Sequence, residues 1–281
     1  MSDVETARIL SANSKKTNSV YLEAIGLAAP GLIGWNSSKP ILAGRQPYAP
    51  VALEKYKPTQ LPLNEARRAT ELVRMAFRVA EDLMGNTSIP MRDCANVFSS
   101  SGGDYVIVDQ ICRSLCEPER MVSPTQFHNS VHNSAAGYWS IATGSRLPSS
   151  SLSSFDDSFC MGLLEAISLC KTENLPTLLV VYDIKPPFPL STKRFITLEF
   201  GVAFLLSTTS SAESIARLNL SPVGADRPPT KASAELETIR LANPAARSLP
   251  LLEILARNQS GTIIFSNANH NSYQLEVNAC R

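Results

Sequence analysis

Two strongly apolar runs constrain the fold of this chain more than any other feature. Residues 176–183 read PTLLVVYD, and residues 201–208 read GVAFLLST. Such runs carry apolar side chains on both faces, which is typical of strands that are covered on both sides. Segments with helical periodicity lie between the candidate strands along the chain. This alternation predicts an α/β sandwich with buried sheets.

Periodicity and turn residues divide the rest of the chain into elements. Proline-rich residues 47–62 and 225–233 are expected to be loops, Asn64 is a candidate N-cap, and Gly144 is expected to end a helix. We expect further strands at 19–27, 149–154 and 215–224, a buried strand in 95–104 that runs into Gly102 and Gly103, and a last pair near 262–278. We expect helices at 64–84, 105–116, 128–143, 157–171, 233–242 and 249–257.

Composition narrows the class of protein. The chain has 281 residues and a net charge of +1, which fits a flexible terminus (1–18) followed by a single domain (19–281). No basic stripe suggests nucleic-acid binding, and no apolar run is long enough to span a membrane. The terminus lacks the apolar segment of a signal peptide. Six cysteines without a CxxC pair predict reduced thiols and a cytoplasmic protein.

The stretch SSSLSSFDDSFCMGLLEA (149–166) resembles a strand-to-helix turn that displays a reactive residue. This turn, the elbow (residues 154–157), carries Asp156 and Asp157, and the nearest thiol is Cys160 inside the helix. The two carboxylates could serve acid–base chemistry, or one could cap the helix. Cys160 could act as a nucleophile only in an electropositive site, and two nearby carboxylates would raise the pKa of its thiol.

Two weaker patterns are also present. His128 and His132 are spaced like zinc ligands on a helix, but Asn rather than Glu follows the first, so hydrogen bonding is the favoured interpretation. The turn Ser99–Gly103 lies between a strand and a helix, where phosphate can bind. It lacks the lysine of a P-loop, so a tight turn near a pocket is the favoured interpretation.

The segment SPTQFHNSVHNSAAGYWSIATGSRLPSSSLSSFDDSF (123–159) resembles the core of β-ketoacyl-ACP synthases of the thiolase fold. It matches the family pattern without a gap at Ser123, Pro124, Asn133, Gly144 and Pro148. VYLEAIGLAAPG (20–31), LAGRQPY (42–48), LEFGVAFLLS (198–207) and IIFSNANHNSYQLEV (263–277) are similar to further family segments. The resemblance implies a layered α-β-α-β-α sandwich, truncated in its C-terminal half because the chain is much shorter than the family.

In this alignment Asp156 occupies the position of the catalytic cysteine. A carboxylate is a poor acyl carrier, because its acyl derivative would be a mixed anhydride of higher energy than a thioester. The family's two catalytic histidines have no counterpart between residues 208 and 262, and His270 matches neither. The resemblance therefore implies no catalytic residue, no metal and no cofactor. It implies a subunit similar to a chain length factor, in particular the partner subunit of aryl polyene synthesis in Gram-negative bacteria.

The same resemblance implies partners and the surfaces that meet them. Residues Ser149, Ser150, Ser151, Leu152, Ser153 and Ser154 would pair with an active ketosynthase across the dimer axis, as in the family. Gln126, Phe127, Phe155 and Asp156 would line or close the acyl tunnel. Arg67, Arg68, Lys193 and Arg194 are candidates for contact with the acidic acyl carrier protein. Two alternatives stay open: an autonomous acyltransferase or thioesterase-like enzyme that uses Cys160 or Asp156, and an acyl-carrier-protein-binding scaffold.

Overall fold

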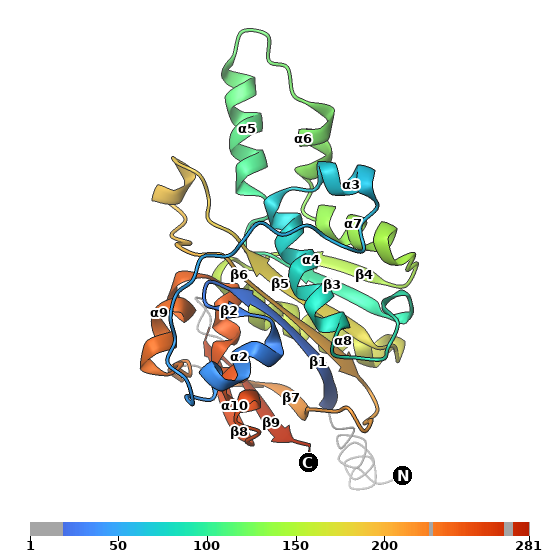
Figure 1. The fold of residues 1–281 in the computed structure, drawn as a ribbon, viewed down its shortest axis with the longest axis vertical. Helices are drawn as coiled ribbons and strands as arrows, with labels where there is room; N and C mark the ends of the chain where they lie inside the picture. Colours follow the sequence, from blue (N-terminus) through green and yellow to red (C-terminus); the bar gives the residue numbers. More distant parts are fainter. Residues whose placement is uncertain (1–18, 225–226, 267–271, 281) are drawn as a thin grey trace, which may run out of the picture.

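A mixed sheet forms the centre of the computed structural model, which describes residues 19–224, 227–266 and 272–280. Its strands follow the order β4-β3-β5-β6-β1-β7-β9-β8, with β4, β3 and β5 parallel and the remaining pairs antiparallel (Figure 1). The strands are β1 (Ser19–Ala29), β3 (Ala95–Ser99), β4 (Ser149–Leu152), β5 (Thr177–Asp183), β6 (Phe200–Ser207), β7 (Ala216–Val223), β8 (Gly261–Ser266) and β9 (Ser272–Ala279), and the short β2 (Leu32–Ile33) pairs with β1.

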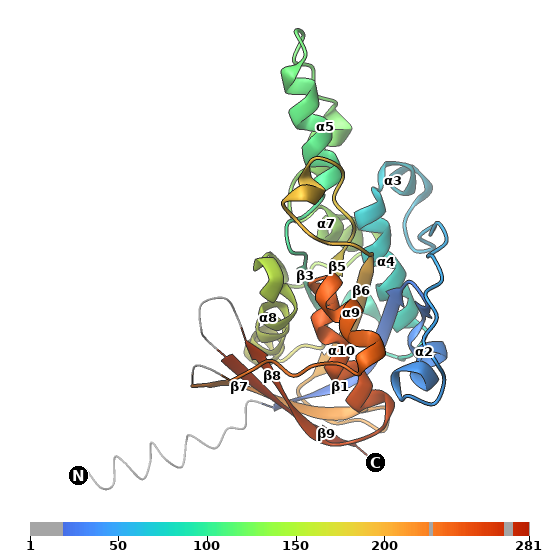
Figure 2. The ribbon, with the colours of Figure 1, turned by 90° about the vertical axis from the view of Figure 1, so that its left-hand side faces the viewer.

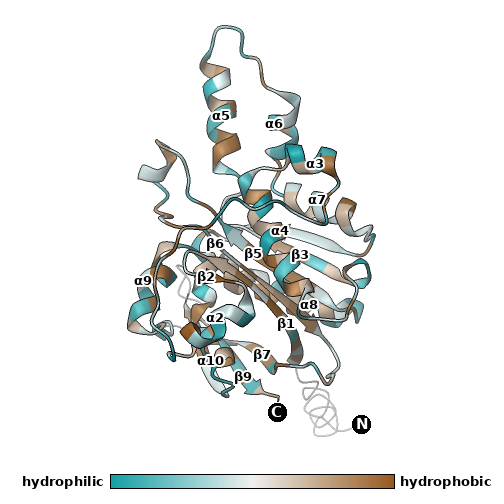
Figure 3. Cartoon of the chain, in the orientation of Figure 1, coloured by the Kyte–Doolittle hydropathy of each residue, from teal (hydrophilic) through white to brown (hydrophobic). Residues whose placement is uncertain are grey.

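Helices cover both faces of the first five strands, as the apolar runs predict. Every residue of β5 is buried, and only the last residue of β6 is not (Figure 3). On one face lie α4 (Glu71–Met84) and α7 (Ser134–Thr143), and on the other lie α8 (Ser158–Glu173) and α10 (Leu249–Ala256). The chain approaches closely at Gly26, where a side chain would place its Cβ 1.9 Å from the Val79 carbonyl oxygen of α4.

The last three strands form a further layer on the other side of α8. The ring of Phe159 lies 6.0 Å from Phe204 of β6 and 5.5 Å from Phe265 of β8, so α8 is packed between the two sets of strands. The outward side chains of this layer are polar, and Asn219 donates to Glu276 across it. No helix in the described part of the chain covers that face. The expected layering of strands and helices is therefore present, except that none of the described helices covers this face.

Two expected helices are each divided in the structure. Residues 64–84 form α3 (Leu63–Arg68) and α4, because Ala69 is extended and the Thr70 hydroxyl accepts the Val73 N–H as the N-cap of α4. Asn64 is therefore not the N-cap. Residues 128–143 form the end of α6 (Pro124–Asn129) and then α7, with a turn between them. Gly144 ends α7 in the left-handed conformation, as predicted.

A helical arm, residues 105–129, projects from the body of the molecule (Figures 1 and 2). It consists of α5 (Tyr105–Cys116) and α6, which are linked by a hydrogen bond from Gln126 to Gln110. Arg113 donates to the carbonyl of Phe188, which fixes the loop after β5 against the arm.

The remaining elements are short. They are α2 (Trp35–Leu42), α9 (Ala234–Ala242) and the 3-10 turns η1 (Met91–Asp93), η2 (Phe155–Asp157), η3 (Leu190–Thr192) and η4 (Ala245–Ser248). The expected loop at 225–233 is seen from residue 227, and Thr230 bonds to Ile264 along the edge of β8. Residues 1–18 lie outside the described residues. The helices that are described are all too short or too polar to cross a bilayer.

Candidate functional site

The elbow joins the edge strand β4 to α8 through η2, as the sequence predicts. Its shape is fixed by Ser158, whose hydroxyl accepts the Ser154 N–H at 3.0 Å and donates to the Phe155 carbonyl at 2.8 Å. Phe155 has a φ of 50°, a left-handed conformation that costs free energy for any residue except glycine. Strained strand-to-helix turns of this kind display a nucleophile in some enzymes. Here the strained residue is a phenylalanine, one position before Asp156.

Asp156 forms an ion pair rather than a helix cap. The Arg194 Nη1 lies 2.5 Å from the Asp156 Oδ1, and the Arg194 guanidinium lies 3.8 Å from the centre of the Phe155 ring. The α8 N-terminus has no side-chain cap bond from its N-cap residue, Asp157. Arg194 is only 9% exposed, so its expected role as a surface contact for a carrier protein is wrong.

A buried carboxylate occupies the turn that was considered for phosphate. Asp183, at the end of β5, accepts hydrogen bonds from the Ser100 hydroxyl and from the N–H and hydroxyl of Ser101. Asp104 likewise accepts the first N–H groups of α5. These internal carboxylates occupy the donors that a phosphate would need. Burial raises the pKa of the Asp183 carboxyl to about 6, against the opposing effect of its hydrogen bonds and of the Arg194 charge.

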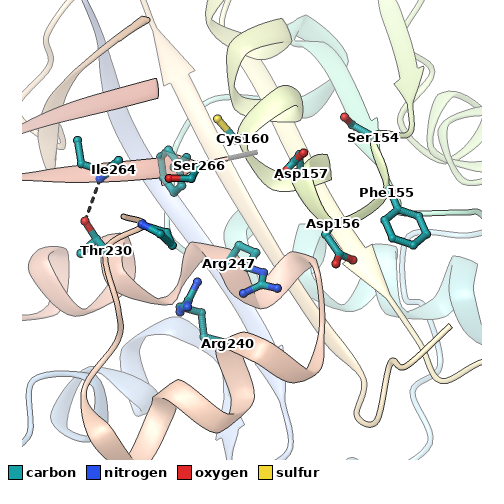
Figure 4. A pocket seen from close by; sticks show the side chains of 12 residues that line it. Ser154, Phe155, Asp156, Asp157, Cys160, Thr230, Arg240, Arg247, Ile264 and Ser266 are labelled. Atoms are coloured by element: carbon teal, nitrogen blue, oxygen red, sulfur yellow. Dashed lines mark hydrogen bonds between the residues drawn. The ribbon is translucent and has the colours of Figure 1, made fainter. Parts of the chain in front are cut away.

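A cavity of about 660 Å³ opens beside the elbow. In Figure 4, Asp156, Asp157 and Cys160 lie on one side of it, and Arg240 and Arg247 lie opposite. The Cys160 thiol is buried, and burial followed by the charge of Asp157 raises its pKa to about 12. A thiol with that pKa is almost entirely protonated at neutral pH and is a weak nucleophile. The cavity therefore lacks an activated thiol at Cys160.

The two candidate metal ligands do not come together. The division of the expected helix places His128 in α6 and His132 in the following turn. The His128 ring packs edge-on against Tyr138, and the Nε2 of His132 lies 3.2 Å from the Ser100 carbonyl oxygen. Within the described ranges, no three His, Cys, Asp or Glu side chains are placed to hold a metal ion. His270 lies outside the described residues.

The expected partner surfaces lie on separate elements. Ser149–Leu152 form β4, the edge strand of the sheet, and Ser153 and Ser154 lead into the elbow. Gln126 and Phe127 are on the arm, and the Phe127 side chain is 68% exposed. Phe155 is 60% exposed at the elbow. Arg67, Arg68 and Lys193 are exposed, as a contact with a carrier protein would require.

Sequence reasoning missed Asp183, Arg240 and Arg247. The sequence did carry a signal for Asp183, because it ends a fully apolar strand and a buried carboxylate needs hydrogen-bond donors. No comparable signal marked the arginines, which come from α9 and η4, far from the elbow in sequence.

The model of the β-ketoacyl synthase N-terminal domain matches residues 42–273, more than half of the chain. The chain belongs to the β-ketoacyl synthase family. No curated relative matches it. A chain in the complex of the ketosynthase ApeO with its chain length factor ApeC from Xenorhabdus doucetiae is 25% identical, with a TM-score of 0.69 over 92% of this chain and 99% of that one. A chain of the ishigamide ketosynthase/chain length factor is 13% identical, with a TM-score of 0.71. The match covers 94% of this chain and 100% of that one.

This β-ketoacyl synthase relative has the thiolase-like fold in a shortened form. The ketosynthase from module 1 of the bacillaene synthase of Bacillus amyloliquefaciens is 17% identical with a TM-score of 0.54. The match covers 75% of this chain but only 47% of that one. The short structures from the ketosynthase/chain length factor complexes, in contrast, are covered almost completely. The expected thiolase-like fold and its truncation are thus confirmed.

Proposed function

We propose that this protein is a non-catalytic subunit, similar to a chain length factor, that pairs with an active β-ketoacyl-ACP synthase and shapes its acyl tunnel. The elbow carries the proposal. It has the strand-turn-helix form of a nucleophile site, yet it presents Phe155 and an Asp156 that is ion-paired with Arg194. The similarity to chains of ketosynthase/chain length factor complexes supports the same role.

The elbow chemistry disfavours an autonomous acyltransferase or thioesterase. The raised pKa of Cys160 leaves little thiolate, and its side chain is only 6% exposed. The Asp156 carboxylate is a weaker nucleophile than a thiolate, and the Arg194 ion pair weakens it further. Acyl transfer at either residue would therefore need a rearrangement of the elbow.

The outer edge of β4, which no strand of the described residues pairs with, supports pairing with a ketosynthase. The Asn96 and Ser100 N–H groups of the β3 side bond to the carbonyls of Pro148 and Leu152. Backbone groups alternate in direction along a strand, so those of Ser149 and Ser151 point away from β3. An unpaired edge of this kind can accept a second strand.

The exposed aromatic side chains supply candidates for the tunnel. Phe127 and Phe155 are both large and apolar, and a bulky group that closes a tunnel limits acyl length by a steric stop. We propose that they reach the tunnel at the interface with the partner, with Gln126 beside Phe127. The proposed product class is a polyketide or aryl polyene, made in the cytoplasm, where the six free cysteines would stay reduced.

Co-expression with an active β-ketoacyl-ACP synthase from the same organism tests the pairing. Size-exclusion chromatography with mass detection should give a one-to-one complex, and the chain alone should aggregate or form a homodimer through the open edge. A stable monomer that does not bind this ketosynthase would contradict the proposal. If the chain instead binds the acyl carrier protein by itself, the scaffold function is favoured.

Product analysis of the reconstituted pair tests the tunnel. Phe127→Ala and Phe155→Ala should lengthen the products, because each removes bulk from the proposed stop. Leu63→Ala, which changes an exposed apolar residue on α3, is the matched control and should leave product length unchanged. Unchanged products in both phenylalanine variants would show that the stop lies elsewhere.

A further inference from the structure

The Phe155 ring needs a contact that holds it, because it projects from the surface. Figure 4 draws it at the elbow among the residues that line the cavity, and 60% of its surface is exposed. The left-handed backbone at Phe155 fixes the direction of its Cα–Cβ bond but not the rotation of the ring. An exposed ring that rotates freely would make a poorly defined steric stop.

Arg194 contacts this ring and the next residue at the same time. Its guanidinium stacks on the Phe155 ring at 3.8 Å and donates to the Asp156 carboxylate at 2.5 Å. A planar guanidinium suits this double contact, because it stacks by its face and donates from its edge. The Phe155 ring is thereby held against the Arg194 guanidinium, and the Asp156 carboxylate keeps that guanidinium in place.

The position of Arg194 is also fixed at its backbone. Its N–H donates to the Leu190 carbonyl at 2.9 Å, and its side chain is only 10% exposed. The charge of the fully buried Asp183 acts on the charge of Arg194 from beneath the elbow. Its Nε and Nη2 have no hydrogen-bond partner among the residues that the structure describes. A buried cation is costly unless it is paired, so the burial of Arg194 indicates a positioning role rather than a solvated surface charge.

We propose that Arg194 is a positioning residue that clamps Phe155 and so makes the limit on acyl length sharp. The inference rests on the proposed function, because it takes Phe155 as the steric stop for the acyl chain and Arg194 as the residue that positions Phe155. Asp156 anchors the clamp through its ion pair with Arg194. Loss of the clamp leaves the phenylalanine in place but lets the ring turn aside for longer chains.

The test uses the full chain in complex with the co-expressed ketosynthase. Arg194→Met keeps an unbranched apolar stem but removes the stack and the ion pair, and Arg194→Lys keeps the charge but removes the planar face. With 4-fluorophenylalanine at position 155, both variants should shift and narrow the fluorine resonance. Arg217→Met, a change at an exposed cation on β7, should leave the resonance as in the unmodified complex.

Mass spectrometry of the products gives the second readout. Arg194→Met should broaden the distribution toward longer chains, with Phe155→Ala equal to or beyond it. The double variant should match Phe155→Ala, because a clamp has no effect without its ring. Unchanged products for Arg194→Met, beside lengthened products for Phe155→Ala, would overturn the clamp and leave the proposed function intact. Unchanged products for Phe155→Ala as well would overturn both the clamp and the assignment of the stop to Phe155. If Arg194→Met does not fold, the product lengths of Arg194→Lys are compared with those of Phe155→Ala instead.

Discussion

The residues of the elbow hold the turn in shape through contacts among themselves and with Arg194. Ser158 fixes the turn, Phe155 takes the strained conformation, and Asp156 pairs with Arg194. None of these contacts needs a nucleophile. An elbow without a thiol is therefore maintained by its own hydrogen bonds and ion pair.

Alkylation should distinguish the thiols of this chain. With a pKa of about 12, Cys160 should be about a thousand-fold less ionised at pH 8 than an ordinary thiol, and burial should slow it further. Iodoacetamide labelling followed by peptide mass spectrometry should therefore modify the exposed Cys112 and Cys116 first. These two residues are internal controls. Labelling of Cys160 at the rate of Cys112 would favour the alternative function, an autonomous enzyme that uses Cys160.

The buried Asp183 should make stability depend on pH in a predictable direction. Its pKa is raised from 3.8 to about 6 in the folded protein, so the folded state binds this proton more tightly than the unfolded chain. The stability contribution of this group therefore falls as pH rises from 3.8 to about 6, by up to about 3 kcal/mol.

Asp183→Asn removes this titration while its side-chain oxygen can still accept from Ser100 and Ser101. The free energy of unfolding of the variant, relative to the unmodified protein, should rise between pH 4 and pH 7. Urea unfolding at both pH values measures the difference. A constant difference across this range would show that Asp183 titrates normally, so that Arg194 and the serine donors offset its burial.

At the scale of elements, local patterns predicted most of the fold. The apolar run at 176–183 became β5, and the turn signal at Gly144 ended α7. The breaks at Ala69 and at residues 130–133 were missed, because apolar periodicity continues through both. The Asn129 amide donates to the Arg68 carbonyl across the two break regions, a tertiary contact that no local pattern contains.

The free edge of β4 provides a prediction for one backbone group. Ser151→Pro removes an N–H that points away from β3, and proline is tolerated on edge strands, so the chain should still fold. The complex with the ketosynthase should weaken about 10- to 100-fold, from lost hydrogen bonds and steric conflict with the partner strand.

Ser151→Ala keeps the backbone N–H and is the matched control, which should bind as the unmodified chain does. Titration by fluorescence anisotropy of the labelled chain gives both affinities. Equal affinities for the proline and alanine variants would show that the partner does not add a strand to β4.

At the scale of the whole molecule, local sequence patterns explain the outer layer of strands, whereas the site depends on a contact between distant residues. The outward faces of β7 and β9 are mostly polar, which suits strands that no helix in the described ranges covers. The contact between Arg194 and the elbow joins residues 38 positions apart through the loop after β5. Sequence alone placed the elbow and its two carboxylates, but a long-range ion pair depends on the path of that loop.

Binding of the ketosynthase should stabilise the whole chain by mass action, because only the folded chain presents a complete edge strand. At a partner concentration 100 times the dissociation constant, the gain is about 2.7 kcal/mol, or about 5 °C in melting temperature. Proteolysis after heating, read on the 30.5 kDa band of this chain, follows its unfolding apart from that of the partner. The melting temperature should rise with partner concentration for the unmodified chain and for Ser151→Ala. For Ser151→Pro, whose complex is weaker, it should rise by only about 1–2 °C at the same partner concentration. An equal rise in that variant would mean that the partner binds a surface other than β4.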